Sequence, residues 1–195
     1  MILGITGGTG SGKTTLLSCV EELGGLTLDC DEIYHQLLQT DRNLLNAIEA
    51  RFPGVVQDGK LERKLLGEQV FSDSGALEDL NKITHGAVKN EVLSRLQDAP
   101  KLVAIDAIGL LEGGLAALCD LTVAVTAPEE NRVARLMVRD NISEAYARKR
   151  IRAQKPQEYY ISHCHRHLLN DGTEAAFREK CLAFLHREVI MKENP

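Results

Sequence analysis

The residues Gly7–Thr14 fit the phosphate-binding pattern G-x-x-x-x-G-K-[ST]. Glycines at these spacings let backbone N–H groups turn inward around a phosphate, because no Cβ atoms stand in the way. Lys13 is expected to reach the β- and γ-phosphates of a nucleoside triphosphate, and the Thr14 hydroxyl is a typical ligand for Mg²⁺. The pattern, called a P-loop, therefore predicts a binding site for a nucleoside triphosphate.

Acidic residues follow two apolar runs of the kind that form buried strands. Asp29 and Asp31 come after Leu26–Leu28, and Asp106 closes Leu102–Ile105. Carboxyl ends of parallel strands line the ligand crevice of an open sheet. The Asp29–Asp31 segment could accept a proton from a hydroxyl, hold Mg²⁺ through water, or simply cap a helix. Asp106 could support the Mg²⁺ shell or merely end a strand.

Positive charge is concentrated between Arg132 and Lys155. The segment holds eight basic and two acidic residues, a net charge of +6 in a chain whose total is −5. It is either a solvated helical surface or a lid whose arginines neutralise phosphate charge during transfer. The three histidines 163, 165 and 167 would share one face of a strand. Metal ligands usually come from separated segments, so an ordinary role is favoured for them.

The apolar pattern alternates strands with helices. Strands are expected at residues 1–6, 26–28, 102–106, 121–126 and 165–169, and each of the strands at 102–106 and 121–126 should lead into a helix, with Pro128 in the first turn of the second. Other helices are expected at 12–23, within 31–52 and at 173–189, and residues 55–99 should form two or three helices without a strand. This order predicts an α/β fold, a P-loop-type parallel sheet flanked by helices. Within a single domain, 1–195, we expect a core (1–54, 100–130, 164–195), an inserted helical lobe (about 55–99) and a basic helical lid (about 131–163).

The composition is that of an ordinary globular protein, with 195 residues, 44% hydrophobic and 26% charged. The net charge of −5 and an aromatic content of 4% argue against a nucleic-acid partner. No uncharged apolar run reaches the ~18 residues of a membrane helix, and the start lacks the basic flank of a signal peptide. Five cysteines without a CxxC pair indicate free thiols in a reducing cytosol. We therefore expect a cytoplasmic protein without a membrane partner, as a monomer or small homo-oligomer.

The chain resembles the dephospho-CoA kinase family, whose members carry out the last step of coenzyme A synthesis. Gly4–Thr14 looks like the family's G-L-T-G-G-I-G-S-G-K-S, and Asp29–Asp31 like its D-A-D. Asp58–Arg63 is similar to D-G-x-L-x-R. Further matches follow the family order and cover nearly the whole chain: Val70-Phe71, Leu80-Asn81, His85, Arg135, Arg139, Ser143–Ala145, Arg150-Ile151, Gln154, Asn170 and Gly172.

The resemblance implies an ATP:dephospho-CoA phosphotransferase that uses Mg²⁺ and phosphorylates the ribose 3′-hydroxyl. Asp31 would be the base that activates this hydroxyl, and Arg139 with Arg135 would close over the transferring group. Asp31, Arg63 and His85 would bind the acceptor. The residues expected to bind ATP are Gly8, Thr9, Gly10, Ser11, Gly12, Lys13, Thr14, Thr15, Arg135 and Asn170. Catalysis is assigned to Asp31, Lys13 and Arg139, and Mg²⁺ binding to Thr14 and, through water, to Asp106.

The chain departs from the family pattern at four positions. Ile108 and Gly109 replace a proline and a leucine, Gly86 replaces the proline after His85, and His165 replaces an acid. These positions lie outside the phosphate-binding residues and bear on the acceptor and the adenine. One alternative is another P-loop kinase for a small molecule. The other is a nucleotide-dependent switch, which Asp106–Gly109 fits as D-x-x-G, although the guanine-reading N-K-x-D is missing.

Overall fold

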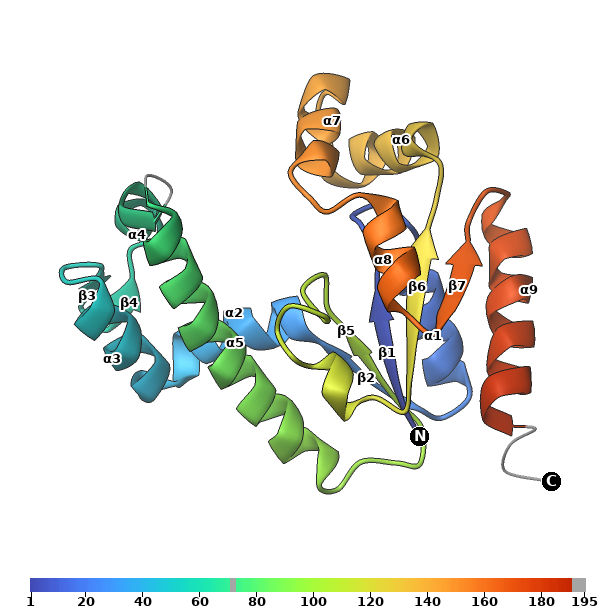
Figure 1. Ribbon diagram of the computed structural model, residues 1–195, viewed down its shortest axis with the longest axis horizontal. Coiled ribbons are helices and arrows are strands. Elements are labelled where there is room, and N and C mark those ends of the chain that lie inside the picture. Colours follow the sequence, from blue (N-terminus) through green and yellow to red (C-terminus); the bar gives the residue numbers. More distant parts are fainter. Residues whose placement is uncertain (71–72, 191–195) are drawn as a thin grey trace. The chain divides into compact units, whose positions relative to one another are not determined.

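The centre of the fold is a five-strand sheet with the order β2-β5-β1-β6-β7 (Figure 1). The computed structural model describes residues 1–70 and 73–190. Its strands are β1 (Ile2–Thr6), β2 (Leu26–Asp29), β5 (Val103–Asp106), β6 (Leu121–Thr126) and β7 (Arg166–Leu169). Strand β1 pairs in parallel with β5 and β6, and β6 pairs in parallel with β7. The carboxyl ends of these four strands therefore lie at one edge of the sheet.

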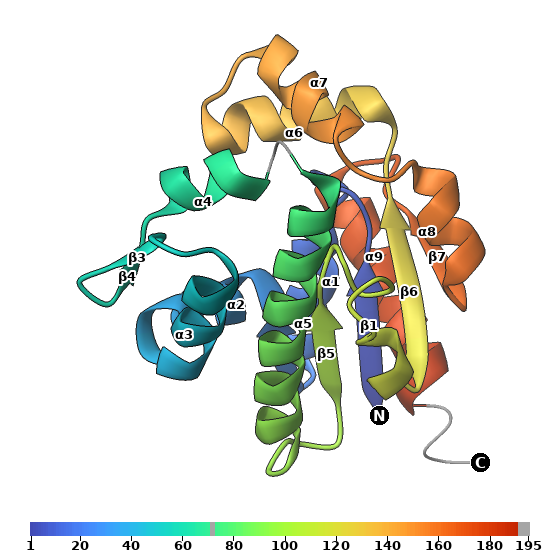
Figure 2. The same ribbon diagram turned by 60° about the vertical axis from the view of Figure 1, so that its left-hand side comes forward.

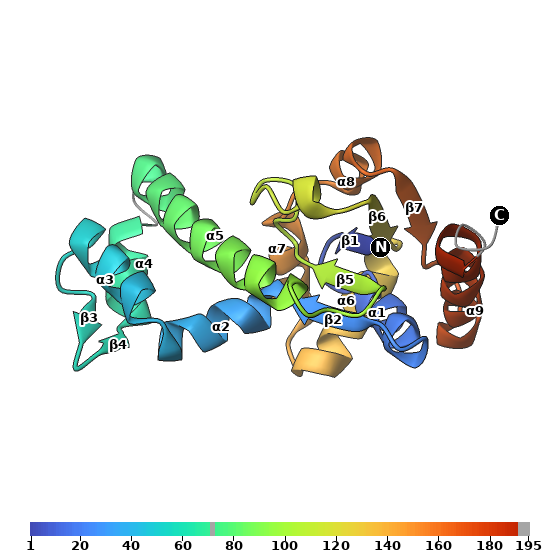
Figure 3. The same cartoon turned by 90° about the horizontal axis from the view of Figure 1, so that it is seen from below.

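Helices cover both faces of the sheet, as the view from below shows (Figure 3). On one face, α1 (Lys13–Glu22) and α9 (Glu174–Leu185) pack side chains such as Leu16 and Phe177 against the strands. The π-helical turn His186–Ile190 extends α9. On the other face lie η1 (Ala116–Leu118) and α8 (Gln157–His163). Because both faces are covered, β6 is buried along its whole length.

Two helices follow β6 and form a small pair with its own apolar contacts. They are α6 (Glu129–Asp140) and α7 (Glu144–Arg152). Val133 and Leu136 of α6 pack against Ala147 and Ile151 of α7. The Ser143 side chain caps α7 by accepting a hydrogen bond from the Tyr146 N–H at 3.3 Å. The pair lies within the segment for which a basic lid is predicted.

The chain divides into two compact units, Met1–Leu28 with Ala99–Pro195, and Asp29–Asp98. The second unit contains α2 (Cys30–Thr40), α3 (Arg42–Arg51), β3 (Val56–Gln57), β4 (Lys60–Leu61), α4 (Arg63–Val70) and α5 (Ser74–Leu96), all visible in Figure 2. Asp41 separates α2 from α3, because its carboxylate accepts from the N–H groups of Asn43 and Leu44 and starts a new helix. The functional division into core, lobe and lid stays a prediction.

Three expectations about secondary structure were wrong. Residues 55–99 contain a short hairpin, β3–β4, because Asp58 (φ 50°) and Gly59 (φ 73°) both adopt the left-handed conformation of a tight hairpin turn. The described chain has no α-helix between β5 and β6, where a hydrogen bond from Gly113 N–H to Gly109 O closes a turn ahead of η1. Pro128 is the N-cap of α6 and not a residue of its first turn.

The histidine-rich segment also differs from the expectation. The three histidines do not share a strand, because His163 ends α8 and β7 begins only at Arg166. Phe71, part of the family resemblance, lies outside the described residues. All five cysteines are free. No helix in the described ranges is long and apolar enough to cross a bilayer.

Candidate phosphate-transfer site

The P-loop joins β1 to α1 and depends on glycine at its ends. Gly7 has φ 139°, and a Cβ built on it would lie 2.1 Å from the carbonyl oxygen of Val125. Gly12 is the N-cap of α1 with φ 103°, and no side chain caps this helix end. The N–H groups of the first turn and the positive end of the helix dipole therefore remain available for an anion. This is the geometry that phosphate binding requires.

Lys13 places a positive charge beside this loop. Its Nζ donates to the Gly7 carbonyl oxygen at 3.1 Å and lies 4.0 Å from Asp106 Oδ1. The two side chains are only 13% and 14% exposed, so their attraction is weakly screened. The Ser11 hydroxyl is buried, and none of the residues that the structure describes gives it a hydrogen bond. Buried hydroxyls usually have a hydrogen-bond partner, so the Ser11 hydroxyl is suited to bind a polar ligand held by the loop.

Side chains from α6 and from the end of β7 bind the outer side of the loop. Arg135 Nη1 donates to the carbonyl oxygens of Gly10 (3.1 Å) and Ser11 (3.4 Å). Asn170 Nδ2 donates to Ser11 O at 2.9 Å, and Arg135 Nη2 donates to Asn170 Oδ1 at 3.0 Å. Arg135 and Asn170, both expected to bind ATP, are thus brought together against the P-loop backbone.

Arg132 makes the matching contact at Thr9. Its Nε donates to Thr9 O at 2.8 Å, and Gln154 Oε1 accepts from the Thr9 N–H at 2.8 Å. Sequence reasoning missed Arg132 as a site residue and cited Gln154 only as part of the lid spacing. The available signal was its position three residues before Arg135, which places both side chains on one face of a helix. We call Arg132 and Arg135 the inner arginines.

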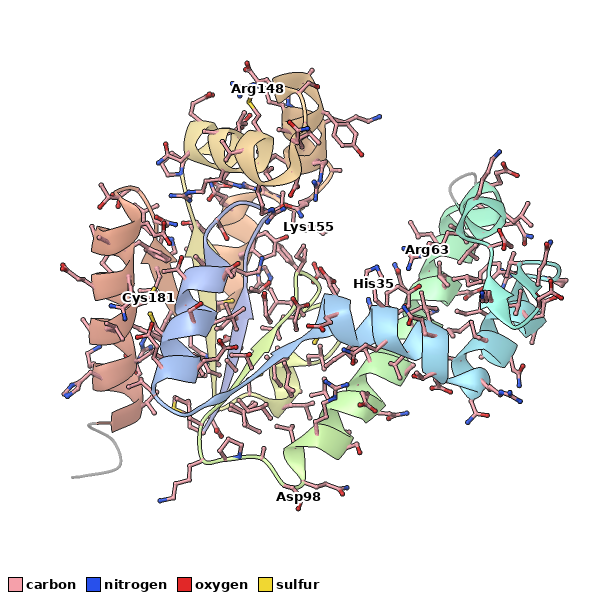
Figure 4. The ribbon with its side chains drawn as sticks, turned by 180° about the vertical axis from the view of Figure 1, so that it is seen from behind. His35, Arg63, Asp98, Arg148, Lys155 and Cys181 are labelled. Atoms are coloured by element: carbon pink, nitrogen blue, oxygen red, sulfur yellow. The ribbon has the colours of Figure 1, made fainter. Side chains whose placement is uncertain are left out.

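The remaining arginines of the α6–α7 pair behave differently. Arg139 binds the adjacent Asp140 through Nε (2.7 Å) and Nη2 (3.0 Å), and Arg150 Nη1 binds the same carboxylate at 2.5 Å. These hydrogen bonds, first that of Arg139, lower the pKa of Asp140 to about 2. Arg148 is held by carboxylates of both helices (Figure 4). We call Arg139, Arg148 and Arg150 the outer arginines.

In the second unit, Asp29 and Asp31 have separate roles. The Asp29 carboxylate caps α2 by accepting from the N–H groups of Asp31 (2.8 Å) and Glu32 (3.1 Å). Asp31 is exposed, and its backbone oxygen lies 2.6 Å from His35 Nδ1. The capping role that the sequence left open thus belongs to Asp29. The Asp31 carboxylate is not the cap.

The second unit also holds a pocket of about 190 Å³. Arg63 and His35 line it, and Figure 4 shows both side chains on the same part of the unit. Most of the lining is apolar, from Leu38, Leu61, Leu66, Val70 and Leu80. His85 is half-buried on α5 and does not line this pocket. Of the three residues expected to bind the acceptor, Arg63 lines this pocket, and Asp31 and His85 do not.

Two histidines of the segment 163–167 bind β6. His165 Nδ1 accepts from the Thr122 N–H at 3.0 Å, and His167 Nε2 lies 2.6 Å from Thr126 Oγ1. Residues 1–70 and 73–190 contain no group of three His, Cys, Asp or Glu side chains arranged to hold a metal. The contacts with β6 give these two histidines a structural role.

The sequence model of the dephospho-CoA kinase family matches residues 1–176 of the chain. This chain belongs to the dephospho-CoA kinase family. It is 39% identical over 160 residues to the dephospho-CoA kinase of Moorella thermoacetica, covering 78% of this chain and 76% of the relative. It is 35% identical over 193 residues to that of Dehalococcoides mccartyi, covering 96% of both chains. Dephospho-CoA kinases are ATP-dependent phosphotransferases, so the chain is an enzyme of that class.

Solved structures agree with this family. The dephospho-CoA kinase of Campylobacter jejuni superposes with a TM-score of 0.70 at 25% identity, over 100% of this chain and 98% of the other. TT1252 of Thermus thermophilus has a TM-score of 0.81 at 32% identity, with 97% of both chains covered. A shikimate kinase of Acinetobacter baumannii, with a TM-score of 0.54 and 19% identity, shares the fold. The predicted P-loop kinase fold is confirmed.

Proposed function

We propose that the chain transfers the γ-phosphate of ATP to the ribose 3′-hydroxyl of dephospho-CoA and so forms coenzyme A. The observation that carries the proposal is the geometry of the P-loop. In this member of the dephospho-CoA kinase family, the loop lies beside positively charged groups that could bind phosphate. Lys13 and the uncapped end of α1 supply positive charge where Gly7–Thr14 would hold the phosphates. Phosphoryl transfer needs this positioning and neutralisation more than covalent help from the protein.

Hard oxygen ligands suited to Mg²⁺ stand beside the loop. Thr14 lies in the first turn of α1, next to Lys13. Asp106 is the last residue of β5, and its Oδ1 lies 4.0 Å from Lys13 Nζ. Mg²⁺ prefers oxygen ligands and keeps several waters, so one hydroxyl, one carboxylate through water and phosphate oxygens would suffice. When bound, the ion neutralises charge on the β- and γ-phosphates. Thr14 and Asp106 would hold it.

Asp31 is the proposed general base. Asp29 takes the capping role, so the Asp31 carboxylate is not needed to start α2. Asp31 is exposed to solvent, which leaves it accessible to a substrate hydroxyl. A carboxylate that accepts this proton during attack contributes on the usual scale of general-base catalysis, about 100-fold or more.

The acceptor is proposed to bind to the second unit. Dephospho-CoA is an anionic molecule with an extended, partly apolar arm. The pocket at α2, β4, α4 and α5 combines apolar walls with the guanidinium of Arg63, a lining that suits such a molecule. His85 would contribute from outside this pocket.

The first experiment measures ADP release from Mg-ATP with and without dephospho-CoA, using other nucleosides and shikimate as controls. We expect strong stimulation by dephospho-CoA alone, with coenzyme A formed in equal amount. Asp31→Asn should lower turnover about 100-fold or more. Glu32→Gln is the matched control, because it removes a carboxylate from the same helical turn and should leave turnover within about two-fold of the parent.

Two outcomes would contradict the proposal. Stimulation by another acceptor, with none by dephospho-CoA, would reject the substrate and leave the P-loop kinase fold intact. Turnover of the Asp31→Asn variant within a few-fold of the parent would reject Asp31 as the base. A pH profile of kcat distinguishes the base from a residue that only binds, since loss of the base removes the acidic limb of the profile.

A further inference from the structure

Arg132 is a buried arginine whose hydrogen bonds go to neutral groups. The residue is 4% exposed, and it binds the Thr9 carbonyl oxygen and the Gln154 side-chain oxygen. Burial lowers its pKa from the usual arginine value. Burying a charged side chain is costly unless its donors are satisfied. The packing of α6 alone therefore does not explain why a charged arginine is buried at position 132.

Gln154, two residues after the end of α7, binds both Arg132 and the backbone of Thr9. Its Oε1 accepts from the Thr9 N–H at 2.8 Å and from Arg132 Nη2 at 3.3 Å. Both polar groups of the Thr9 backbone are thus bound from outside the loop, by one residue of α6 and one that follows α7. These bonds connect the α6–α7 pair to the P-loop.

The consequence concerns the peptide between Thr9 and Gly10. No peptide bond within residues 1–70 and 73–190 is cis, so the carbonyl oxygen of Thr9 and the N–H of Gly10 point in opposite directions. When Arg132 holds that carbonyl outward, the Gly10 N–H is turned toward the interior of the loop. Glycine at 10, with φ 75°, would otherwise let this peptide rotate.

Gly8 shows how closely the guanidinium approaches. A Cβ built on Gly8 would lie 2.3 Å from Arg132 Nη2 and 2.8 Å from Arg132 Cζ. Any side chain at position 8 would therefore displace the guanidinium of Arg132. Gly8, at a position where the pattern allows any residue, thus makes room for Arg132.

We propose that Arg132 and Gln154 are positioning residues for phosphoryl transfer, which hold the Thr9–Gly10 peptide with its N–H facing the nucleotide phosphates. The proposal rests on the proposed function only in that the P-loop binds ATP. Neither residue needs to touch the substrate. The segment that contains the α6–α7 pair then has two tasks, since Arg132 and Gln154, which lie before and after its outer arginines in the chain, also preset the shape of the phosphate site.

The test compares Arg132→Lys and Gln154→Met with Arg148→Lys as the matched control. Lysine keeps the charge of Arg132 but cannot bind Thr9 O and Gln154 with a planar fork. Methionine keeps the volume of Gln154 and removes the acceptor. The Kd of Mg-ADP is measured by calorimetry without acceptor, and the KM values of ATP and dephospho-CoA are measured separately. Folding is checked by circular dichroism and the melting temperature.

We expect Arg132→Lys to raise the Kd of ADP and the KM of ATP about ten-fold, with the KM of dephospho-CoA within two-fold of the parent. Gln154→Met should raise the same two quantities about three-fold. Arg148→Lys should change neither. A merely structural role would lower the melting temperature and leave the Kd of the folded protein unchanged, and this result would overturn the proposal.

The half-buried Gln154 keeps the proposal testable if Arg132→Lys does not fold. In that case a parental Kd for ADP in folded Gln154→Met would overturn it. ADP binding does not require the acceptor, so these results are independent of whether dephospho-CoA is the substrate. A chain that lacks activity toward dephospho-CoA but binds ADP more weakly in both variants would reject the substrate and support the positioning role.

Discussion

The inner arginines lie on α6 and the outer arginines on α6 and α7, but the two sets have opposite surroundings. Arg132 and Arg135 bind backbone carbonyl oxygens of the P-loop, and burial lowers the pKa of both guanidiniums. Arg139 and Arg148 bind carboxylates, and these hydrogen bonds raise their pKa values. Arg139 keeps 57% of its side chain exposed. The inner arginines are bound to the P-loop backbone, while the outer arginines form ion pairs with carboxylates at the surface.

These surroundings determine which arginines can change partners during a reaction. Bonds from a buried guanidinium to the backbone cannot be exchanged without leaving a buried charge unsatisfied, so the inner arginines act as fixed structure. Exposed ion pairs are weak and exchangeable, and a phosphate can replace a carboxylate as the partner of an arginine. Among the outer arginines, Arg139 has the most exposed side chain and is therefore the one suited to contact the transferring phosphate.

Gly12→Ala should break the loop that the inner set supports. The new Cβ would lie 2.2 Å from Asn170 Nδ2, and Asn170 is bound to Arg135. We expect turnover to fall by at least about 100-fold, because the N–H groups at the start of α1 lose their positions. Gly24→Ala is the matched control. Gly24 also has a positive φ (77°) but nothing within 4 Å.

The control separates backbone strain from loss of the loop. Gly24→Ala should cost about 1 kcal/mol of stability, because a left-handed alanine is strained, and leave turnover near the parental value. Equal losses of turnover in the two variants would show that strain, and not the position of Asn170 and Arg135, accounts for the effect. Turnover and chemical denaturation are the two measurements.

Arg139→Ala tests the outer set. If Arg139 contacts the phosphoryl group only as it transfers, kcat should fall about 100-fold while the KM of ATP stays within about three-fold. Steady-state kinetics at saturating acceptor provide the measurement. A rise in the KM of ATP with unchanged kcat would place Arg139 with the ground-state binding residues and remove the distinction between the two sets.

The sequence predicts the P-loop well because its conformation is set locally. Glycines at fixed spacing, a preceding strand and a following helix are all adjacent in the chain, so the pattern alone indicates the turn and its ligand. The strand positions follow from apolar runs for the same reason. Even the missed β3–β4 hairpin had a local signal, Asp58-Gly59, which the surrounding helical periodicity obscured.

The contacts behind the loop could not be predicted in this way. Arg132 is 123 residues from Thr9, and no local pattern states which arginine of a basic segment turns inward. Only the packing of α6 against the loop decides that Arg132 is buried and Arg139 is exposed. Similarly, the choice between Asp29 and Asp31 as the cap depends on exact helix boundaries, which periodicity locates only to within a few residues.

Arg148→Ala should have a small effect, although Arg148 has more carboxylate partners than any other described arginine. It pairs with Glu129, Glu130 and Glu144, at 2.7–3.1 Å. Exposed pairs contribute little, so we expect turnover within about two-fold and a melting temperature within about 3 °C of the parent. A larger loss of turnover would mean that the relative position of α6 and α7 matters for the outer arginines.

The smallest expected effect is a pH dependence of protein stability that arises from Asp140 and its two arginine partners, Arg139 and Arg150. Asp140 has a pKa of about 2 in the folded protein, below the ordinary 3.8, because Arg139 and Arg150 bind its carboxylate. Its stabilising contribution is therefore complete above the unfolded pKa and disappears as the pH falls from about 3.8 to about 2. Activity near neutral pH should not respond, since the group stays charged there.

Carbon-detected NMR of the aspartate carboxyl groups measures this directly. The Asp140 signal should titrate near pH 2, and Arg139→Gln should move its midpoint toward 3.8. The inner arginines bind carbonyl and amide oxygens, so their N–H signals should not shift with the Asp140 titration. An Asp140 midpoint near 4 in the parent protein would show that the carboxylate does not hold Arg139 and Arg150 in solution. Those arginines would then reach the nucleotide without first leaving a partner.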